Sequence, residues 1–482
     1  MAAPTVGDGA TPRSGWGEWL RWFALCLVIG ATWAAAVPTL GGPDEQAHIT
    51  KAAAVALGEL DGATVRTELG DVTLVHTPEI YSSTPSKQTK RCFAGQGEVP
   101  ASCASPVEGR AEVVDALTYV GTYPPGYYLL IGLPTRFVAS RAGFAWMRAI
   151  GVALGAALLA STLASAASGG GRSRLLAGAA LAMSPMVWYL IGVVNPNGVE
   201  VAGALCAAAA VVALGDAHPT ERGRLIRRAT IGFVACSLAR TPSLGFALLA
   251  VGLGWLSLGE RRPPWRELPG LRIAAGAAAL TAALAVGWAL TRSTGGAGEA
   301  LTHEPVVTSI GETGRFVRQA IGDFGELDTP LPWPLWGAWA AVVSVLIGAG
   351  LARGDRSQRM SLGLAVLAAT AIPVTFQALA VAPVGANWQG RYGLPALVLV
   401  PVLAGASIPR RWPQPGVGAA LAVAVVVQVG ALFTLLRRYQ VGVDGPVWFL
   451  AEGTWRAPME LGVLLVASLL AWWALAVAVA RR

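Results

Sequence analysis

Residues 16–51 read WGEWLRWFALCLVIGATWAAAVPTLGGPDEQAHITK. The first part of this stretch, from Trp16 to about Leu40, is an apolar run long enough to cross a bilayer, which takes about 20 residues. We interpret it as an uncleaved anchor rather than a signal peptide. The run from Gly41 to Lys51 that follows is polar, so the sequence places it at a membrane surface.

The composition extends this interpretation to the whole chain. Of its 482 residues, 54% are hydrophobic and 13% are charged, whereas soluble domains carry about 25% charged residues. This excludes a soluble globular, disordered, collagenous or disulfide-rich secreted protein. The formal charge of +8 does not indicate a nucleic-acid partner, because the arginines punctuate apolar runs instead of gathering on one surface. The fold class is therefore an all-α polytopic membrane protein.

About twelve candidate spans follow from the apolar runs. They lie at 17–40, 143–167, 175–194, 197–215, 228–240, 242–259, 273–291, 334–352, 361–382, 392–408, 415–436 and 461–480. The many small residues, including 59 glycines, are typical of membrane helices that pack closely. We expect one transmembrane domain over residues 1–482.

The arginines predict the orientation of these spans. Alternate connections carry the arginines at 172–174, 222–228, 261–266, 353–359, 410–411 and 481–482. By the positive-inside rule these connections and both termini are cytoplasmic. The large outer loop is then 41–142, with smaller outer loops at 292–333 and 437–460. Residues 123–138 are apolar too, but a span there would reverse the downstream orientation, so we expect an amphipathic interfacial helix.

Two further features depend on this layout. The pair 228–240 and 242–259 is weak as two spans, because thirteen residues fall short of a crossing, and a re-entrant hairpin is the alternative. Cys92 and Cys103 both fall in the outer loop, where an oxidising compartment favours a disulfide between them. The alternative is two unpaired thiols.

The candidate catalytic residues follow the first span. Pro43 and acidic residues suit a helix start, so Asp44, His48 and Lys51 are expected on one helical face, beside Glu45. Ionisable groups at the end of a membrane span are often functional. The alternative is a solvated helix N-terminus. Asp44, Glu45 and His48 together also offer ligands for one divalent cation.

A second polar cluster lies at residues 385–392. Arg391, in a short glycine-bounded turn with Trp388, Gln389 and Tyr392, has the forked donor geometry that binds phosphate. The alternative is an arginine that snorkels to the interface beside belt aromatics.

Weaker candidates occupy other outer ends of spans. They are Tyr123, Tyr127 and Tyr128 as the lining of a lipid or sugar groove, Asn197 and Glu200 at a tight turn, Arg240 at a hairpin tip, and His303 with Glu304 in the second outer loop. Anchoring, turn formation and snorkelling are their structural alternatives. The sequence has neither a phosphate-binding glycine loop nor a zinc spacing of the usual kinds, so no cofactor beyond the possible cation is expected.

Three motifs in this order resemble a known family. They are Pro-Asp-Glu-x-x-His at 43–48, Tyr-Pro-Pro-x-Tyr-Tyr at 123–128 and Gln-Gly-Arg-Tyr at 389–392. Together they are similar to the bacterial membrane-protein family called domain of unknown function 2142 (DUF2142), over about residues 20–440. That family in turn resembles the glycosyltransferase C (GT-C) superfamily, whose multispanning enzymes use polyprenyl-phosphate sugars outside the membrane.

The resemblance implies a GT-C-like bundle with a catalytic acid in the first outer loop, here Asp44, with Glu45 as its neighbour. It implies transfer of a sugar from a polyprenyl-phosphate donor to a cell-envelope glycan or glycolipid at the outer face of the bacterial cytoplasmic membrane. Arg391 is the first choice for the donor phosphate, and Lys51, Arg240 and His48 are helpers. A soluble C-terminal carbohydrate-binding domain, which larger relatives have, is missing. The alternatives are a transporter or flippase for a lipid-linked saccharide and a noncatalytic partner of an envelope assembly complex.

Overall fold

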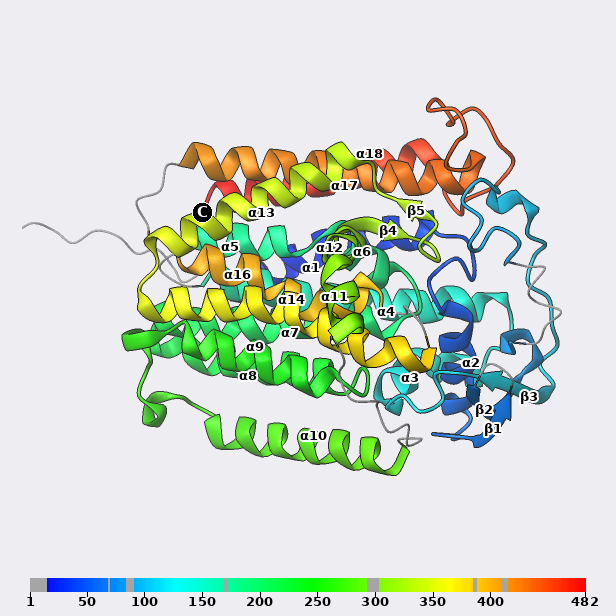
Figure 1. The fold of residues 1–482 in the computed structure, drawn as a ribbon, viewed down its shortest axis with the longest axis horizontal. Helices are drawn as coiled ribbons and strands as arrows, with labels where there is room; N and C mark the ends of the chain where they lie inside the picture. The colour runs from blue at the N-terminus through cyan, green and yellow to red at the C-terminus, as the bar shows by residue number, and fades with distance from the viewer. Residues whose placement is uncertain are drawn as a thin grey trace, which may run out of the picture.

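Long helices run side by side along most of the molecule (Figure 1) in a computed structural model that describes residues 15–67, 70–83, 91–168, 172–292, 303–384, 388–409 and 414–482. Within these ranges, eight helices are long and apolar enough to cross a membrane. They are α1 (Gly15–Ala36), α4 (Arg141–Ala166), α7 (Pro196–Ala213), α10 (Leu271–Arg292), α13 (Trp333–Arg353), α14 (Arg356–Val384), α17 (Gln414–Val441) and α18 (Leu461–Ala480).

A ninth span is formed if a bent helix pair counts as one crossing. Helices α5 (Arg172–Ala182) and α6 (Pro185–Gly192) meet at an angle of 57°. The break falls at Ser184, and Pro185 occupies the first turn of α6, where a proline costs no hydrogen bond. The predicted span at 175–194 therefore corresponds to a bent helix pair, which by length and composition is either a broken span or a re-entrant loop.

Three of the twelve predicted spans do not pass as crossings by length and composition. They correspond to α8 (Pro219–Ser237), α9 (Ser243–Leu256), and the short run of α15 (Gly390–Leu397) with α16 (Leu399–Ala406). Helix α8 begins nine residues earlier than the predicted span and includes the four arginines at 222–228. Helix α8 is continuous, but these charges lower its mean hydropathy, so it does not pass as a membrane crossing.

The centre of the bundle is α7, which is almost wholly buried among α4, α8 and α9. Small residues allow close approach there, as expected of membrane helices. A Cβ placed on Gly203 of α7 would lie 2.8 Å from the carbonyl oxygen of Gly232 in α8. By contrast, α10 lies at the edge of the bundle (Figure 1), and its large apolar side chains, such as Ile273 and Leu290, are exposed. Exposure of this kind is explained by contact with lipid.

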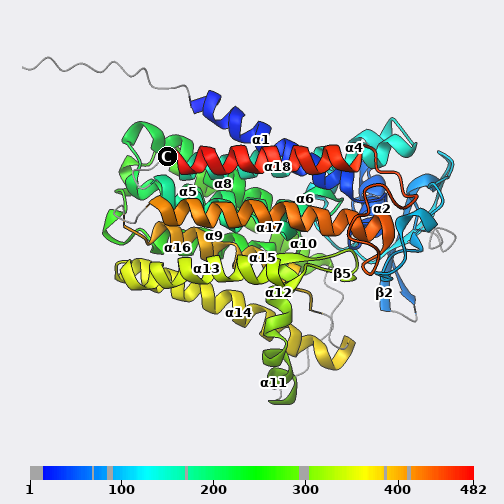
Figure 2. The same cartoon turned by 90° about the horizontal axis from the view of Figure 1, so that it is seen from above.

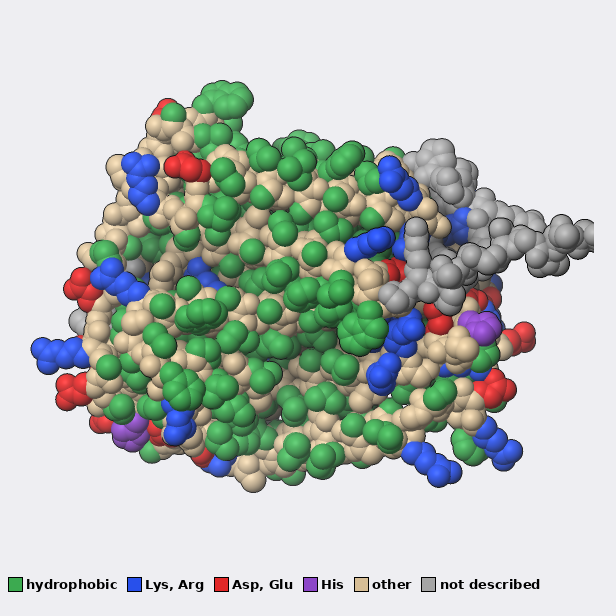
Figure 3. Space-filling view, turned by 180° about the vertical axis from the view of Figure 1, so that it is seen from behind, with side chains coloured by type: hydrophobic (Ala, Val, Ile, Leu, Met, Phe, Trp, Pro, Cys, Tyr) green, Lys and Arg blue, Asp and Glu red, His purple; other side chains and the backbone are tan. Residues whose placement is uncertain are grey.

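The two ends of the bundle differ. The start of α1 and the end of α18 lie at one end (Figure 2), where Arg482 pairs with Glu18 at 2.9 Å. A cavity of about 360 Å³ at this end, lined by Asp216, Arg261, Arg353 and other residues, joins connections predicted to share one side. We call it the termini end. In Figure 3 hydrophobic side chains cover the face between charged groups at the two ends, which is the pattern of a membrane-embedded surface.

The opposite end, here called the sheet end, carries most of the predicted large loop. Helix α2 (Glu45–Ala56) is followed by an antiparallel sheet in the order β1-β2-β3, whose strands are β1 (Ala63–Thr67), β2 (Gly70–Pro78) and β3 (Val113–Thr118). A short ladder joins β4 (Asp323–Phe324) to β5 (Thr329–Pro330) after helices α11 (His303–Gly311) and α12 (Thr313–Gly322). The sequence did not predict these strands. Cys92 and Cys103 form a disulfide with a Cα–Cα distance of 6.2 Å.

The predicted interfacial helix at 123–138 is present in a different form. Helix α3 (Pro125–Gly132) has only eight residues and runs into a 3-10 turn at Leu133–Arg136. It is too short to cross, as expected, but it is apolar on both sides rather than amphipathic. Tyr128 and Ile131 are buried, whereas Leu129 and Leu130 are exposed. Gly132 packs so closely on the backbone of Ala52 that a side chain would not fit.

Candidate functional site

A tight turn between α1 and α2 positions the first candidate residues. Asp44 adopts a left-handed backbone conformation with φ 56°, which is uncommon outside glycine but more frequent for aspartate. Gly42 packs against the side chain of Val193, where a Cβ would come within 2.6 Å. Helix α2 begins at Glu45, so Asp44 lies just before the first helical residue.

Glu45 holds this turn in place. Its carboxylate is fully buried and receives two hydrogen bonds from Arg148 of α4, at 2.7 and 2.6 Å. The backbone N–H groups of Gly42 and Val194 donate to it as well, at 3.0 and 2.9 Å. Every direction open to the carboxylate is therefore occupied, and Glu45 acts as a structural residue rather than as the neighbouring catalytic candidate that the sequence suggested.

Asp44, by contrast, is accessible and charged. Its side chain is 26% exposed, and its two oxygens accept hydrogen bonds from Arg391 at 2.5 Å and from the phenol of Tyr119 at 2.6 Å. Burial would raise the pKa of the carboxyl, but the charge of Arg391 and the hydrogen bond from Tyr119 outweigh it and hold the pKa below its usual value. The structure thus brings together two residues that are 347 positions apart in the sequence.

Arg240 lies beside this pair, between two aromatic rings. Its guanidinium carbon is 4.9 Å from the ring centre of Tyr392 and 5.7 Å from that of Tyr123. It also contacts the buried Glu200 at 3.4 Å. Arg391 contacts the Tyr392 ring too, at 5.2 Å. Arg240 and Arg391 form the positively charged part of the site. The faces of Tyr123 and Tyr392 favour a cation at these positions.

Several buried N–H groups here have no partner within the described part of the chain. They belong to the Nε atoms of Arg391 and Arg240, the indole of Trp388 and the side-chain amide of Gln377. The ring of Trp388 contacts that of Tyr392 at 5.5 Å, and the backbone N–H of Trp388 donates to the side-chain oxygen of Gln377. Because buried donors are normally satisfied, this set indicates a place where an acceptor-rich ligand, such as a phosphate, would bind.

His48 is buried behind the carboxylate and is neutral. Its Nδ1 lies 2.8 Å from the hydroxyl of Tyr128, and its ring is 6.0 Å from that of Tyr123. Burial lowers its pKa to about 3, although the neighbouring Asp44 acts in the opposite direction. His48 is therefore not a cationic helper for phosphate but part of the wall on which Asp44 rests.

The pKa of His48 predicts an acid-dependent loss of stability. The unfolded histidine takes up a proton near pH 6.5, whereas the folded one resists protonation down to about pH 3, so stability falls as the pH drops through this window. His48→Gln should flatten the fall. The measurement is the thermal unfolding midpoint in detergent between about pH 7 and pH 5. His76→Gln, at an exposed histidine, is the matched control, and equal slopes in all three proteins would contradict the prediction.

Other predicted residues lie outside the cluster. Lys51 donates to the carbonyl oxygens of Leu60 and Gly121, at 2.5 and 2.6 Å, in the packing of α2 on the sheet region. Lys51 is thus a structural residue that does not reach Arg391. Its predicted role as a helper in phosphate binding is wrong. The predicted alignment of Asp44, His48 and Lys51 on one helical face is not present, because Asp44 precedes the first helical residue.

The remaining predicted residues support the site from behind or lie apart from it. The amide of Asn197 is 3.5 Å from the carbonyl oxygen of Arg391. Tyr127 is buried against Tyr128, and a backbone hydrogen bond joins it to Asn195. Gln389 is half-buried and its side-chain oxygen has no partner in the described ranges. The side chains of His303 and Glu304 lie outside the described residues.

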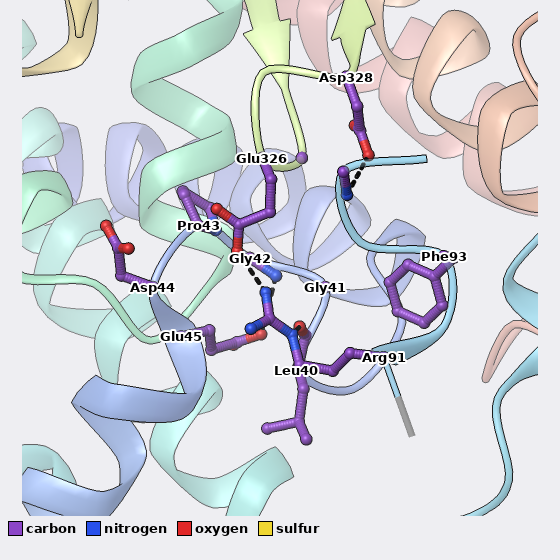
Figure 4. A network of polar contacts seen from close by, with 12 residues as sticks. Leu40, Gly41, Gly42, Pro43, Asp44, Glu45, Arg91, Phe93, Glu326 and Asp328 are labelled. Carbon is purple, nitrogen blue, oxygen red and sulfur yellow. Dashed lines mark hydrogen bonds and ion pairs between the residues drawn. The ribbon is translucent and has the colours of Figure 1, made fainter. Parts of the chain in front are cut away.

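Two residues near Asp44 were not predicted. One is Tyr119, which binds its carboxylate directly. The other is Arg91, shown in Figure 4 between the turn and the β4–β5 connection, where it pairs with Glu326 and donates to the carbonyl oxygen of Leu40 at 2.9 Å. The charge of Arg91 contributes to the low pKa of Asp44. Neither residue stands in a recognisable motif, so only the fold reveals them.

The expected cation ligands do not converge. Glu45 faces Arg148, and His48 faces Tyr128, so Asp44 is the only member of the predicted trio that lies open. Within the described ranges, no three histidine, cysteine or acidic side chains are grouped so as to hold a metal ion. The structure therefore does not support the predicted cation site at Asp44, Glu45 and His48.

A bundle of membrane-length helices with a polar cluster at one end defines a polytopic α-helical membrane protein. Among known proteins, the chain matches the family model described as a predicted membrane protein, DUF2142, over residues 27–400. It belongs to that family. No curated protein and no solved structure matches the chain.

Proposed function

We propose that the protein is a membrane glycosyltransferase that moves a sugar from a polyprenyl-phosphate donor to a cell-envelope glycan or glycolipid. The observation that carries the proposal is the juxtaposition of an accessible carboxylate, Asp44, with two buried arginines whose Nε donors have no partner among the described residues. A base beside an anion-binding pair is what inverting transfer from a sugar phosphate requires.

The chemistry follows from these groups. The acceptor hydroxyl oxygen attacks the anomeric carbon and forms the new glycosidic bond, while the bond from that carbon to the phosphate oxygen breaks. Asp44 takes the hydroxyl proton. The departing phosphate keeps the electron pair of the broken bond, and Arg391 and Arg240 stabilise its negative charge. While Arg391 pairs with Asp44, the pKa of the carboxyl is low. A phosphate bound to Arg391 would weaken this pairing, raise the pKa of Asp44 and make it a stronger base.

An apolar cavity next to Arg391 suits the lipid part of such a donor. It has a volume of about 200 Å³ and is lined by side chains of α5, α12, α13 and the α15–α16 region, including Val317, Trp339 and Leu394. Helix α15 begins at Gly390, whose N–H donates to Gln319 of α12, so the cavity and Arg391 share one helix. An isoprenoid chain could then enter between helices while its phosphate stays at the sheet end.

The charge distribution supports the orientation and the enzyme class in this proposal. Among the described residues, Arg261, Arg353 and Arg482 of the arginine-rich connections lie at the termini end, so the sheet end would face outward across a bacterial cytoplasmic membrane. A transporter or flippase would place ionisable groups along a path near mid-membrane, whereas Asp44, Arg240 and Arg391 gather at one end. The GT-C type of bundle, and crossings by α8, α9 and α15–α16 that would complete twelve spans, belong to this proposal.

Binding of a polyprenyl monophosphate to the purified full chain in lipid nanodiscs tests the anion site. Arg391→Ala should weaken binding by about tenfold or more, because a charge-assisted hydrogen bond to a buried phosphate is worth about 1.5–3 kcal/mol, and Arg391→Lys should restore part of it. Arg359→Ala, at the termini end, is the matched control. Unchanged binding by folded Arg391→Ala would overturn the assignment of this residue, and no binding by the wild type would overturn the enzyme class.

A further inference from the structure

A groove that is separate from the candidate site opens at the sheet end, between α1, α4 and the segment before α18. It has a volume of about 450 Å³. Its apolar walls include Leu27, Ala31 and Val152, and its charged lining includes Arg141 and Arg456. None of these residues takes part in the proposed transfer.

The order of residues along the helices gives the groove a polar end and an apolar end. On α4, Arg141 is the first helical residue and Val152 lies eleven residues deeper, which is about 16 Å at 1.5 Å per residue. Helix α1 runs the opposite way, from Leu27 to Ala36 at its end. One leaflet of a bilayer has an apolar depth of about 15 Å. The groove therefore matches the depth of one leaflet, which would place its basic end at the headgroup level.

The two outer arginines are available to an anion. Arg456 is exposed and makes no hydrogen bond or ion pair with any residue in the described ranges. Arg141 uses its Nε on the carbonyl oxygen of Val107, and one terminal nitrogen lies 3.2 Å from the exposed Glu108. Its other terminal nitrogen has no hydrogen bond within the same ranges. Trp455, the half-buried residue before Arg456, also lines the groove and suits an interfacial position.

Arg148 closes the inner wall and separates the groove from the candidate site. All five of its N–H groups donate, two to Glu45 and three to the carbonyl oxygens of Ala34, Val37 and Pro38. It has no donor left for a ligand. Because Glu45 is the residue after Asp44, the same arginine links the groove wall to the turn that holds the proposed base.

We propose that this groove binds an anionic glycerophospholipid, with its phosphate between Arg141 and Arg456 and an acyl chain along Leu27, Ala31 and Val152. Any lipid phosphate shares this chemistry, including a polyprenyl phosphate. The glycerophospholipid is favoured because the saturated Arg148–Glu45 pair walls the groove off from Asp44. The lipid supports the end of α1 and the start of α4, which Arg148 ties together. This proposal does not depend on the proposed transferase activity.

Native mass spectrometry of the full chain, released from nanodiscs of mixed phosphatidylglycerol and phosphatidylcholine, tests the proposal. The wild type should retain phosphatidylglycerol in preference to phosphatidylcholine. The double variant Arg141→Gln/Arg456→Gln should lose this preference by about fivefold for each arginine, the usual effect of a basic residue on anionic lipid. Ala31→Trp should lower retention of the lipid by filling the groove without a change of charge.

The matched control is Arg356→Gln/Arg359→Gln at the termini end, which removes two exposed arginines from α14 and should leave the preference intact. A second arm adds a polyprenyl monophosphate, which should not displace the phosphatidylglycerol. Displacement, an equal loss in the control, or full retention by the double variant and by Ala31→Trp would overturn the assignment. Because Arg391→Ala lies outside the groove, its effect on polyprenyl phosphate separates failure of the two proposals.

Discussion

Asp44→Asn is expected to lower sugar transfer by about 10²–10⁴-fold, the usual contribution of a general base. The asparagine keeps the size of the side chain and can still accept a hydrogen bond from Tyr119, but it cannot take the proton of the acceptor hydroxyl. Arg391 would lose its ionic partner and face the donor phosphate alone. The measurement is transfer from a labelled polyprenyl-phosphate sugar to an acceptor, with binding of polyprenyl monophosphate measured on the same sample.

Binding and chemistry separate the roles of the residue. Asp44→Asn should bind the lipid phosphate at least as tightly as the wild type, because a competing carboxylate has been removed from Arg391. Asp61→Asn is the matched control, since that carboxylate also lies at the sheet end but pairs with Arg292, away from Asp44. Normal transfer by a folded Asp44→Asn protein would exclude this residue as the base, whatever its effect on binding.

Membrane spans can be predicted from sequence because lipid imposes one strong constraint, a run of apolar residues of fixed length. Helices α1, α4, α7, α17 and α18 follow that rule. The rule is weaker where a helix is bent or partly charged, as in α5–α6 and α8. It says nothing about the strands β1, β2 and β3, which form at the sheet end under ordinary soluble-protein constraints. Residues 113–118 read VVDALT, a pattern too short to be distinguished from a loop.

The candidate site was only partly predictable, for a related reason. Asp44 and Arg391 each stand in a recognisable motif, and the fold brings them together across the chain. Lys51 was misassigned, because a spacing of seven residues places two side chains on one face only if both are helical. Asp44 is in a left-handed conformation before the helix. Tyr119 contacts Asp44 only through the fold, since nothing in its local sequence distinguishes it from an interfacial aromatic.

Glu45→Gln is expected to destabilise the protein by about 3–5 kcal/mol, the usual cost of leaving one partner of a buried ion pair uncompensated. Glu45 is fully buried and Arg148 is 11% exposed, so water cannot replace the lost charge. An amide offers a single acceptor oxygen for the two donors of Arg148 and the N–H groups of Gly42 and Val194. The measurement is the midpoint of thermal unfolding in detergent, followed by tryptophan fluorescence.

The double variant Glu45→Gln/Arg148→Gln distinguishes an uncompensated charge from lost packing. If the unpaired guanidinium is the cause, removal of that charge should make the double variant more stable than the sum of the two single effects, by about 0.5–3 kcal/mol of coupling. Arg66→Gln on strand β1, where the arginine side chain is 93% exposed, should shift the midpoint little. Strict additivity of Glu45→Gln and Arg148→Gln would show that the two side chains stabilise α1, α2 and α4 separately, and the turn that presents Asp44 would then not depend on their pairing.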